Sequence, residues 1–495
     1  MKFNHYINGT WVKPHSGQYF SVRNPFNQHV LADVASGDKE DVNNAVDAAR
    51  DAFNLWSIKL PSERAAILWK LAELVEKNTK KLATIESTNQ GKTIKYARDS
   101  DLLFIIDNLR FFAGAARMLE GKSAAEYSGM GTSMIRREPL GVVAGIVPWN
   151  YPLLIAVWKL APALAAGNSL VLKPASLTPL SLLEFVKLTE KAGIPKGVVN
   201  VVTGSGESVG GALALHRGVD MLSLTGDTTT GKKVMQLASS TVKKVHLELG
   251  GKAPMIVLPD ADIEMAAQGA VVGGYWNGGQ DCTAVTRVLV QKQMQASLVR
   301  AMVKRAKRFK LGNQLHEHTD MGPLVSAQHR ARVEKHIQHA VNDGAKIACG
   351  GKRPAAKELQ QGNFIEPTIL THVHQKMNVC REEIFGPVIA VQTYDSVQDA
   401  LEQANDVDYG LAASVYGKNG RDCMDAARKL NFGTVWINEH GVLTSETPHG
   451  GFKQSGFGKD LSLYAMDEYT RLKHVYVDLT GLQRRSWHYT VYGKK

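Results

Sequence analysis

Apolar residues recur at helical spacing in the first part of the chain. Between residues 62 and 82, Ile67, Leu71, Leu74 and Val75 fall on one side of a helical repeat. We therefore expect an amphipathic helix over residues 62–82 that packs against a larger body.

From Gly141 onward the pattern changes to short apolar runs that alternate with helical stretches. Four strands are expected: one at residues 142–147, one that ends at 172–173, one at 198–202 and one at 221–224. Helices are expected at 153–166 and 180–192. Strands that alternate with helices at this spacing predict a parallel sheet with helices on both faces.

A second alternation of the same kind runs from residue 254 to about 438. It includes helices near 295–309 and 327–342 and a strand at 434–437. The two blocks predict two α/β domains with a cleft between them. Two further pieces, 125–137 and 469–477, are strand-like and fit neither block. We expect them to pair into a small protruding sheet that joins subunits.

Length and composition agree with this division. A chain of 495 residues is too long for one core, so two or three domains are expected. Hydrophobic residues make up 44% and charged residues 21%, which is ordinary for a soluble globular protein. The four cysteines lie far apart, without the spacing of a zinc site or the density of a disulfide scaffold. We expect no metal site and a cytoplasmic location.

Neither a membrane nor a nucleic acid is expected as a partner. The stretch from Leu140 to Trp158 carries no charge and is nearly long enough to span a membrane. Pro148, Asn150 and Pro152 interrupt it, so we expect a strand, a turn and the start of a helix there. The net charge of +12 comes from lysines and arginines scattered along the chain, without a nucleic-acid motif. A basic surface around a site for an anionic cofactor is the simpler interpretation.

One thiol and one carboxylate stand on glycine-flanked turns. Cys282 follows Gly278-Gly279, and Glu248 precedes Gly250-Gly251. The glycines permit unusual backbone and close approach of a ligand, so a nucleophile and its base are suggested, and with them acyl transfer through a thioester. A buried apolar cysteine and a surface carboxylate are the alternatives from these residues alone.

Two glycine-containing turns are candidates for cofactor binding. Gly204-Ser205-Gly206 resembles a dinucleotide fingerprint, but Val209 stands at its third glycine and Gly210 comes one place late, so a plain tight turn is as good an interpretation. Thr225-Gly226-Asp227, at a strand end that opens a helix, can place backbone N–H groups under a pyrophosphate.

The amide of Asn150, in a constrained turn, can donate to an oxyanion or satisfy its own backbone.

Taken together, these residues resemble the aldehyde dehydrogenase superfamily over nearly the whole chain. The motifs occur in the family's order: PWNYP at Pro148, KPAS at Lys173, LTG at Leu224, LELGGK at Leu247, GQDC at Gly279, EEIFGP at Glu382 and PHGGFKQSG at Pro448. The resemblance implies a Rossmann-like NAD(P)-binding domain (1–120 and 140–249), an α/β catalytic domain (250–449) and oligomerisation segments (121–139 and 450–495, with a C-terminal tail). Homodimers or homotetramers are expected.

The resemblance also implies a mechanism. Cys282 attacks the aldehyde carbonyl, the Asn150 side chain and the Cys282 backbone N–H hold the oxyanion, and Glu248 activates the water that releases the acid. The cofactor is expected to contact Trp149, Lys173, Ser176, Gly206, Gly210, Thr225, Gly226, Asp227, Leu249, Gly250, Glu383 and Phe385.

Two of these positions depart from the family pattern. Ser176 replaces a glutamate that often lies against the adenosine ribose, and a serine does not repel a 2′-phosphate, so we expect NADP to be accepted as well as NAD. Asp227 stands where a serine is common beside the pyrophosphate. Its carboxylate should weaken binding unless it turns away to cap the helix.

The substrate pocket is expected to involve positions in four segments: Tyr151, Leu154, Trp158, Trp276, Asp281, Thr283, Leu443 and His449. Asp281 beside the nucleophile attracts cationic substrates, and Glu439, Glu446 and Asp101 add negative charge near the entrance. The aromatic side chains can stack on an ammonium group. Together with the 445–451 and 458–460 runs, these features are most similar to aminobutyraldehyde dehydrogenases, with betaine aldehyde enzymes as relatives, which favours an amino-aldehyde such as 4-aminobutanal.

Several alternatives stay open at this point. They are a broad aldehyde oxidiser, a betaine aldehyde dehydrogenase, a relative that transfers the acyl group to CoA, and a non-catalytic binding homologue. Intact Glu248 argues for water instead of CoA, and the presence of Cys282, Glu248 and Asn150 argues against the non-catalytic form. The chain also continues past the family's usual end, where Trp487 and Tyr489 suggest docking on a neighbouring subunit.

Overall fold

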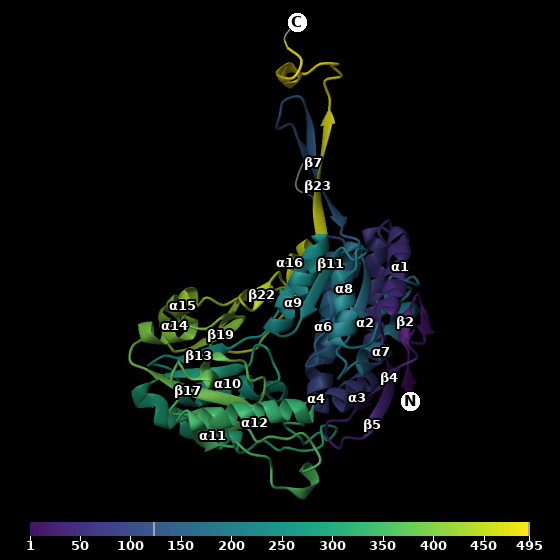
Figure 1. The fold of residues 1–495 in the computed structure, drawn as a ribbon. Coiled ribbons are helices and arrows are strands. Elements are labelled where there is room, and N and C mark those ends of the chain that lie inside the picture. The colour runs from purple at the N-terminus through teal and green to yellow at the C-terminus, as the bar shows by residue number, and fades with distance from the viewer. Residues whose placement is uncertain (122–123, 494–495) are drawn as a thin grey trace.

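Two sheets form the centres of the two halves of the molecule (Figure 1). The computed structural model describes residues 1–121 and 124–493. Residues 122–123 and 494–495, which belong to the expected oligomerisation segments, lie outside this description. Among the described residues no helix is long and apolar enough to cross a membrane.

The first sheet has eight strands in the order β22-β12-β11-β8-β9-β10-β2-β3. Its strands are β2 (His5–Ile7), β3 (Thr10–Val12), β8 (Val142–Ile146), β9 (Ser169–Lys173), β10 (Val199–Val201), β11 (Met221–Thr225), β12 (Lys244–Glu248) and β22 (Gly456–Phe457). The central strands β8 to β12 run parallel, as the alternation in the sequence predicts.

Helices cover both faces of this sheet because alternate residues of its strands point to opposite sides. Val143 and Leu170 face a core shared with α2 (Pro61–Lys77), α5 (Leu102–Ala115), α6 (Pro152–Ala166) and α7 (Leu180–Ala192). Val142 and Val171 face a second core, shared with α1 (Lys39–Trp56), α8 (Gly211–Leu215) and α9 (Thr228–Ala238).

The second sheet has seven strands in the order β15-β16-β17-β14-β13-β19-β20. They are β13 (Ala253–Val257), β14 (Val285–Gln291), β15 (Lys346–Cys349), β16 (Thr368–Thr371), β17 (Val388–Tyr394), β19 (Ala412–Tyr416) and β20 (Thr434–Ile437). The helices packed on it are α10 (Ile263–Tyr275), α11 (Gln295–Ala306), α12 (Ala327–Asn342), α14 (Val397–Asn405) and α15 (Gly420–Lys429).

A long two-stranded arm projects from the body (Figure 1). It is formed by β7 (Gly131–Pro139) and β23 (Thr470–Asp478), which pair antiparallel along their full length, with β6 (Ala124–Ala125) beside β7. The expected pairing of the two isolated strand-like pieces is therefore confirmed. The chain beyond β23 continues at the tip of the arm and includes a short 3₁₀ helix at Ser486–Thr490.

The expected oligomerisation range 450–495 is too long at its beginning. Within it, β22 pairs with β12 in the first sheet, and α16 (Ser462–Glu468) packs against α6. Only residues from 470 onward run out along the arm. The patterning in the sequence does not reveal this return, because β22 is only two residues long.

The expected helix over 62–82 is also interrupted. It is divided into α2, which ends at Lys77, and α3 (Thr79–Gln90). The amide of Asn78 donates to Leu74 O at 2.8 Å, and the Thr79 hydroxyl donates to Glu76 O at 2.8 Å. These side chains compete with the backbone for the carbonyls of the last turn, which is why the helix breaks there.

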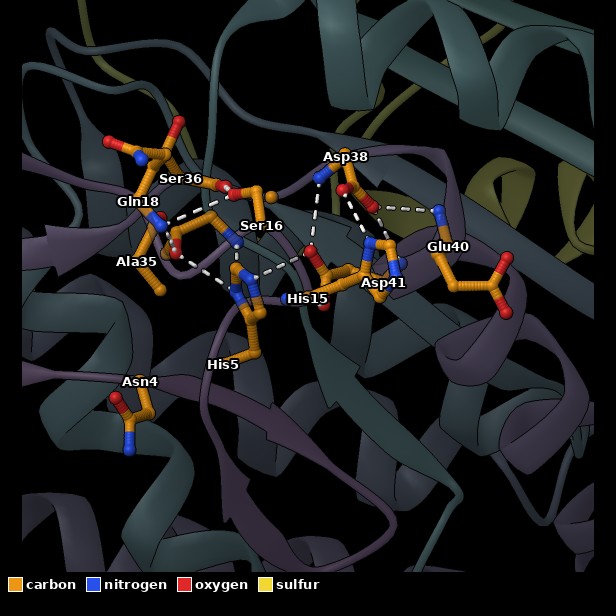
Figure 2. A network of polar contacts seen from close by, with 12 residues as sticks. Asn4, His5, His15, Ser16, Gln18, Ala35, Ser36, Asp38, Glu40 and Asp41 are labelled. Atoms are coloured by element: carbon orange, nitrogen blue, oxygen red, sulfur yellow. Dashed lines mark hydrogen bonds and ion pairs between the residues drawn. The ribbon is translucent and has the colours of Figure 1, made fainter.

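A polar network fixes the N-terminal strand β2 to the rest of the first sheet (Figure 2). His5 is fully buried; its Nε2 lies 3.4 Å from an Asp41 carboxylate oxygen, and its Nδ1 lies 3.2 Å from the Thr203 backbone N. Asp38 caps α1, and Asp41 accepts from the Asp38 backbone N–H at 3.0 Å. The network joins β2, the start of α1 and the turn after β10, which carries Gly204 to Gly206.

Candidate active site

Cys282 lies on a turn between a 3₁₀ segment (Trp276–Gly279) and β14. The turn is tightly confined, because a Cβ on Gly279 would lie 2.3 Å from Gly386 O and one on Gly251 would lie 2.2 Å from Cys282 O. Gly279 also has a positive φ of 69°. Glycine is therefore required at position 279 before the thiol and at position 251 in the turn that follows Glu248, which explains the glycines of both turns.

The thiol stands in an environment that disfavours the thiolate. Burial raises the pKa of Cys282 well above its usual value, and the carboxylates of Asp281, Glu248 and Glu383 raise it further. The sulfur is therefore protonated at neutral pH and needs either a base or a nearby positive charge before it can act as a nucleophile.

Glu248 ends strand β12 and is buried. His449 Nε2 lies 3.8 Å from its Oε2, and His246 Nε2 lies 4.0 Å from its Oε1. Burial raises the pKa of Glu248 well above its usual range, with a further contribution from the charge of Asp460. A carboxyl group with a raised pKa in a buried site is suited to general acid and base catalysis.

A buried polar cluster that was not expected from the sequence surrounds Glu248. Lys159 Nζ is 3.7 Å from Asp460 Oδ2 and donates to Ser223 Oγ at 3.0 Å, while His246 Nδ1 is 4.0 Å from Asp460 Oδ1. Within the described part of the chain, both Asp460 oxygens and Glu248 Oε1 lack a hydrogen-bond partner. The available indication was Lys159 itself, a charged residue in the otherwise apolar helix α6.

Asn150 is directed at the turn that carries Cys282. Its amide Nδ2 donates to Gln280 O at 3.1 Å, and Asn277 Nδ2 donates to Asn150 O at 3.0 Å. Gln280 therefore fixes the side chain of Asn150 and Asn277 fixes its backbone carbonyl, although both lie about 130 positions away along the chain. This contact differs from the local Asx-turn alternative and suits a donor to a group bound on the sulfur.

One side of the candidate cofactor groove comes from the second half of the molecule. Glu383 Oε1 accepts from the Gly251 backbone N–H at 2.8 Å, and burial raises the pKa of Glu383 to about 7. A Cβ on Gly250 would lie 2.3 Å from Glu383 Oε2, so only glycine fits there. The Phe385 and Trp149 rings meet edge to face at 5.1 Å.

The other side lies at the carboxyl ends of the parallel strands, where ligands gather in open α/β sheets. Lys173 ends β9 and donates to Pro174 O at 2.8 Å, and burial lowers its pKa to about 8. Ser176 Oγ donates to Gly204 O at 2.8 Å.

In the glycine-containing turn, Gly206 has open space where a Cβ would point, and Gly210 lies against the Lys173 side chain. The expected helix after the turn begins as a π-helical segment, Gly206–Gly210, that continues into α8.

The turn after β11 has the features expected of a phosphate-binding segment. Thr225 Oγ1 is buried and has no hydrogen-bond partner among residues 1–121 and 124–493, while Gly226 N donates to Glu248 O at 3.0 Å. Asp227 turns its carboxylate onto Thr230 N, at 2.9 Å, and caps α9. Its charge is therefore partly satisfied by the helix. Leu249 packs against Gly231 on the first turns of that helix.

A cavity of about 740 Å³ opens onto Cys282, and all eight residues expected in the substrate pocket line it: Tyr151, Leu154, Trp158, Trp276, Asp281, Thr283, Leu443 and His449. Asp281 is held firmly there. Its Oδ2 accepts from Tyr151 OH at 2.6 Å, and its Oδ1 accepts from Thr283 N at 2.6 Å and from Thr283 Oγ1 at 2.7 Å.

Acidic side chains dominate the charge of this cavity. Asp101, Asp107, Asp281, Glu439 and Glu446 line it, and among the described residues that do so there is no lysine or arginine. Burial lowers the pKa of His449 to about 4 and also lowers that of His440, so neither histidine offsets the acids at neutral pH. The chain as a whole carries a net charge of +12, so the acidity is a local property of the cavity.

The expectation that Asp101 adds charge near the entrance is wrong. It is buried and forms an ion pair with the buried Lys92 at 2.5 Å. Burial raises the pKa of Asp101 to about 6. Lys92 Nζ lies 4.5 Å from the centre of the Tyr151 ring, and Lys92 lines a neighbouring cavity instead of this one. Asp107, Tyr96 and Phe104 also line the cavity and were not expected there. Only the packing of α4 (Ile94–Tyr96) and α5 brings them to it.

Comparison with known proteins supports one family. The model of the aldehyde dehydrogenase family matches residues 11–475. The betaine aldehyde dehydrogenase of Bacillus subtilis (strain 168) is 46% identical over 473 residues, which are 95% of this chain and 96% of that protein.

Solved structures agree with the sequence match. Betaine aldehyde dehydrogenase from Staphylococcus aureus in complex with NAD+ has a TM-score of 0.96 at 40% identity, and the match covers 98% of this chain and 96% of that one. The NAD+ complex of an aldehyde dehydrogenase from Bacillus cereus has a TM-score of 0.95 at 42% identity, with 97% of each chain covered. The expected fold is confirmed, and the chain belongs to the aldehyde dehydrogenase family.

Proposed function

We propose that this aldehyde dehydrogenase oxidises a cationic amino-aldehyde, such as 4-aminobutanal, to its carboxylic acid, with Cys282 as nucleophile. One observation carries the substrate assignment: the cavity above Cys282 is lined by five carboxylates and by no lysine or arginine of the described residues. Such a cavity attracts a positively charged aldehyde and repels an anionic one such as succinic semialdehyde.

Formation of the bond to the aldehyde requires loss of the thiol proton. Cys282 has a raised pKa, and Glu248, with its own raised pKa, is the buried carboxylate that can take the proton. Sulfur then attacks the carbonyl carbon and gives a thiohemiacetal oxyanion. The Asn150 amide and the Cys282 backbone N–H donate to this oxyanion, and each donor of this kind contributes about 3 kcal/mol to the transition state.

The residues of the groove fit a nicotinamide dinucleotide, since Thr225 Oγ1 is an unsatisfied buried hydroxyl beside a helix start and Gly250 leaves space beside Glu383. The chemistry that bound NAD supplies is acceptance of the hydride from the thiohemiacetal carbon, which leaves a thioester on Cys282. Glu248, once it has passed the thiol proton to solvent, removes a proton from the water that attacks the thioester, and the C–S bond breaks to release the acid and the Cys282 thiolate. Glu383 and Phe385 would hold the nicotinamide end, and Lys173 and Ser176 the adenosine end.

Betaine aldehyde is the second candidate substrate, because two of the three relatives compared above are named betaine aldehyde dehydrogenases. Its quaternary ammonium group carries a permanent positive charge, and the aromatic side chains of the cavity, among them Trp158 and Trp276, can bind such a group. It differs from 4-aminobutanal in having no N–H group to donate to the carboxylates.

One substrate panel tests the proposal. NADH release is measured with 4-aminobutanal, betaine aldehyde, succinic semialdehyde, hexanal and pentanal, of which pentanal has the shape of 4-aminobutanal without its charge. We expect the highest kcat/KM with 4-aminobutanal and the lowest with succinic semialdehyde. A higher kcat/KM for pentanal or hexanal than for both cations would refute the charge argument. Acid formation without added CoA distinguishes hydrolysis from transfer to CoA.

We further propose that NADP is accepted as well as NAD. Ser176 offers no negative charge at the position expected beside the adenosine ribose, and its hydroxyl is already bonded to Gly204 O. Comparable kcat/KM values for the two coenzymes would support this proposal, and undetectable turnover with NADP would refute it. Ser176→Glu should remove activity with NADP while keeping activity with NAD.

The projecting arm supports assembly with other copies of the chain. Leu472, Leu479 and Trp487 on the arm and tail are exposed apolar side chains, and burial of such residues is the usual driving force for association. We propose a homodimer or homotetramer, in which the tail docks on a neighbouring subunit. Deletion from Leu482 onward should change the assembly or the access of substrate, and an unchanged enzyme would refute this role. The four cysteines are free thiols, which fits a reducing cytoplasm.

A further inference from the structure

We propose that the preferred substrate is a longer aldehyde with two ammonium groups along one carbon chain, the kind formed when a triamine loses one terminal amine by oxidation. This inference rests on the proposed function, since it assumes that the cavity above Cys282 binds the substrate. It goes further because it assigns separate roles to two groups of carboxylates in that cavity.

The inner carboxylates are already satisfied by the protein. Asp281 accepts hydrogen bonds from Tyr151 and Thr283, and Asp101 is paired with Lys92. They give the inner cavity a negative character, but their oxygens have little capacity left for strong new bonds. One ammonium group beside them is therefore attracted mainly by charge and by the aromatic rings around it.

His449 adds an acceptor to this inner region. It is buried, and burial lowers its pKa to about 4, so its ring is neutral. With Nε2 facing Glu248 at 3.8 Å, its Nδ1 is buried and has no partner in the described ranges of the chain. Since His449 lines the cavity, an ammonium N–H can donate to this nitrogen.

The outer carboxylates are exposed and far less satisfied. Asp107 lies on α5, and Glu439 and Glu446 lie on the loop after β20. Asp107 accepts one hydrogen bond, from Ser445 Oγ at 2.6 Å, and Glu439 accepts one, from His440 N at 2.9 Å. No lysine or arginine of the described residues forms an ion pair with any of the three. These three carboxylates form the rim of the cavity, and a second ammonium group is the partner that the rim lacks.

The size of the cavity agrees with a longer substrate. Its volume of about 740 Å³ is in the upper part of the range for small-molecule sites and is far more than 4-aminobutanal needs. The neighbouring cavity, behind Tyr96 and Trp276, is lined by Lys95, Arg305 and Arg308. These three basic side chains thus lie on the other side of that aromatic wall, and Lys92, which also lines the neighbouring cavity, is paired with Asp101. None of the four lines the acidic cavity.

Three aldehydes test the inference in the intact enzyme: 4-aminobutanal, N-(3-aminopropyl)-4-aminobutanal with two ammonium groups, and N-butyl-4-aminobutanal, which has the same length with one. At low ionic strength we expect kcat/KM for the dication to exceed that for the N-butyl compound at least tenfold, mainly through KM. The ratio should fall as salt is added, because the rim is exposed. Equal values for the two long compounds would overturn the inference.

Variants locate the effect at the rim. Glu446→Gln and Asp107→Asn should each lower the dication-to-N-butyl ratio about threefold to fivefold, the size expected for one exposed ion pair. Glu358→Gln, which removes an exposed carboxylate outside the cavity, should leave the ratio unchanged. An unchanged ratio in both rim variants would overturn the inference even if the dication is preferred. If no cationic aldehyde is oxidised better than pentanal, the proposed function itself fails, which is a distinct result.

Discussion

The charge of Asp460 should set the pH at which the enzyme loses activity on the acid side. Asp460 is fully buried, and its negative charge is the largest electrostatic contribution that raises the pKa of Glu248. Because Glu248 must be deprotonated to act as a base, activity falls as the pH drops through its pKa. Asp460→Asn removes the repulsion and should therefore lower that pKa, so activity persists to lower pH.

The structure gives the size of this shift. His246 contacts both carboxylates. Its Nε2 lies 4.0 Å from Glu248 Oε1, and its Nδ1 lies 4.0 Å from Asp460 Oδ1. Together with the imidazole ring, these contacts place the carboxylates at most about 10 Å apart, where two unit charges repel by about 1.7 kcal/mol at an effective dielectric constant of about 20. This energy corresponds to about 1.2 pK units.

The assay is the pH dependence of kcat with 4-aminobutanal at saturating coenzyme. In Asp460→Asn the midpoint of the acid limb should move down by about 1 unit relative to the parent enzyme. Asp460→Glu retains the charge and serves as the matched control, with a midpoint near that of the parent. A midpoint in Asp460→Asn that is unchanged or higher would refute the electrostatic coupling through His246.

Lys159 provides the opposite perturbation. Its charge lowers the pKa of Glu248, and it lies 3.7 Å from Asp460 in a region where both side chains are fully buried. Lys159→Met should therefore raise the midpoint of the acid limb, and it should destabilise the protein by about 3–5 kcal/mol because it leaves Asp460 buried without its partner. The double variant Lys159→Met/Asp460→Leu should recover most of the loss in thermal stability. A double variant no more stable than the single one would contradict this explanation.

Three further changes have expected outcomes. Asn150→Ala should lower kcat about 100-fold or more, with coenzyme binding retained, and a loss below tenfold in stopped-flow turnover would exclude an oxyanion role. Gly250→Ala places a Cβ 2.3 Å from Glu383 Oε2 and should weaken NAD binding in a fluorescence titration, whereas Gly114→Ala, with open space around it, should not. Asp281→Asn should lower the pKa of the adjacent thiol, seen as faster iodoacetamide alkylation at pH 8, and an unchanged alkylation profile would count against the charge effect.

The sequence predicts the elements whose residues carry a periodic pattern. The helices expected at 180–192 and 327–342 match α7 and α12, and the strand at 434–437 matches β20. Where polar side chains compete with the backbone, the pattern is insufficient, as at Asn78 between α2 and α3. A strand of two residues such as β22 has no periodicity to read, so its return to the first sheet could not be predicted.

The candidate site was predictable where a residue type and its glycine-flanked turn point to chemistry, as for Cys282 and Glu248. It was not predictable where the role depends on a contact across the fold. His246 stands two residues before Glu248 on β12, but its role depends on Asp460, and only the position of the 448–460 segment brings Asp460 to that strand. The buried pairing of Asp101 with Lys92 is more local, because the short helical segments between α3 and α5 bring together two residues nine positions apart.

The most direct test of the account is the detection of an acyl group on one cysteine. The enzyme is mixed with 4-aminobutanal and coenzyme, quenched with acid within the first turnover, digested and examined by mass spectrometry. The account predicts a 4-aminobutanoyl thioester on the peptide that contains Cys282, and in Cys282→Ala neither the adduct nor NADH, although coenzyme still binds. Undiminished NADH release from Cys282→Ala, or an acyl group on another residue alone, would contradict it.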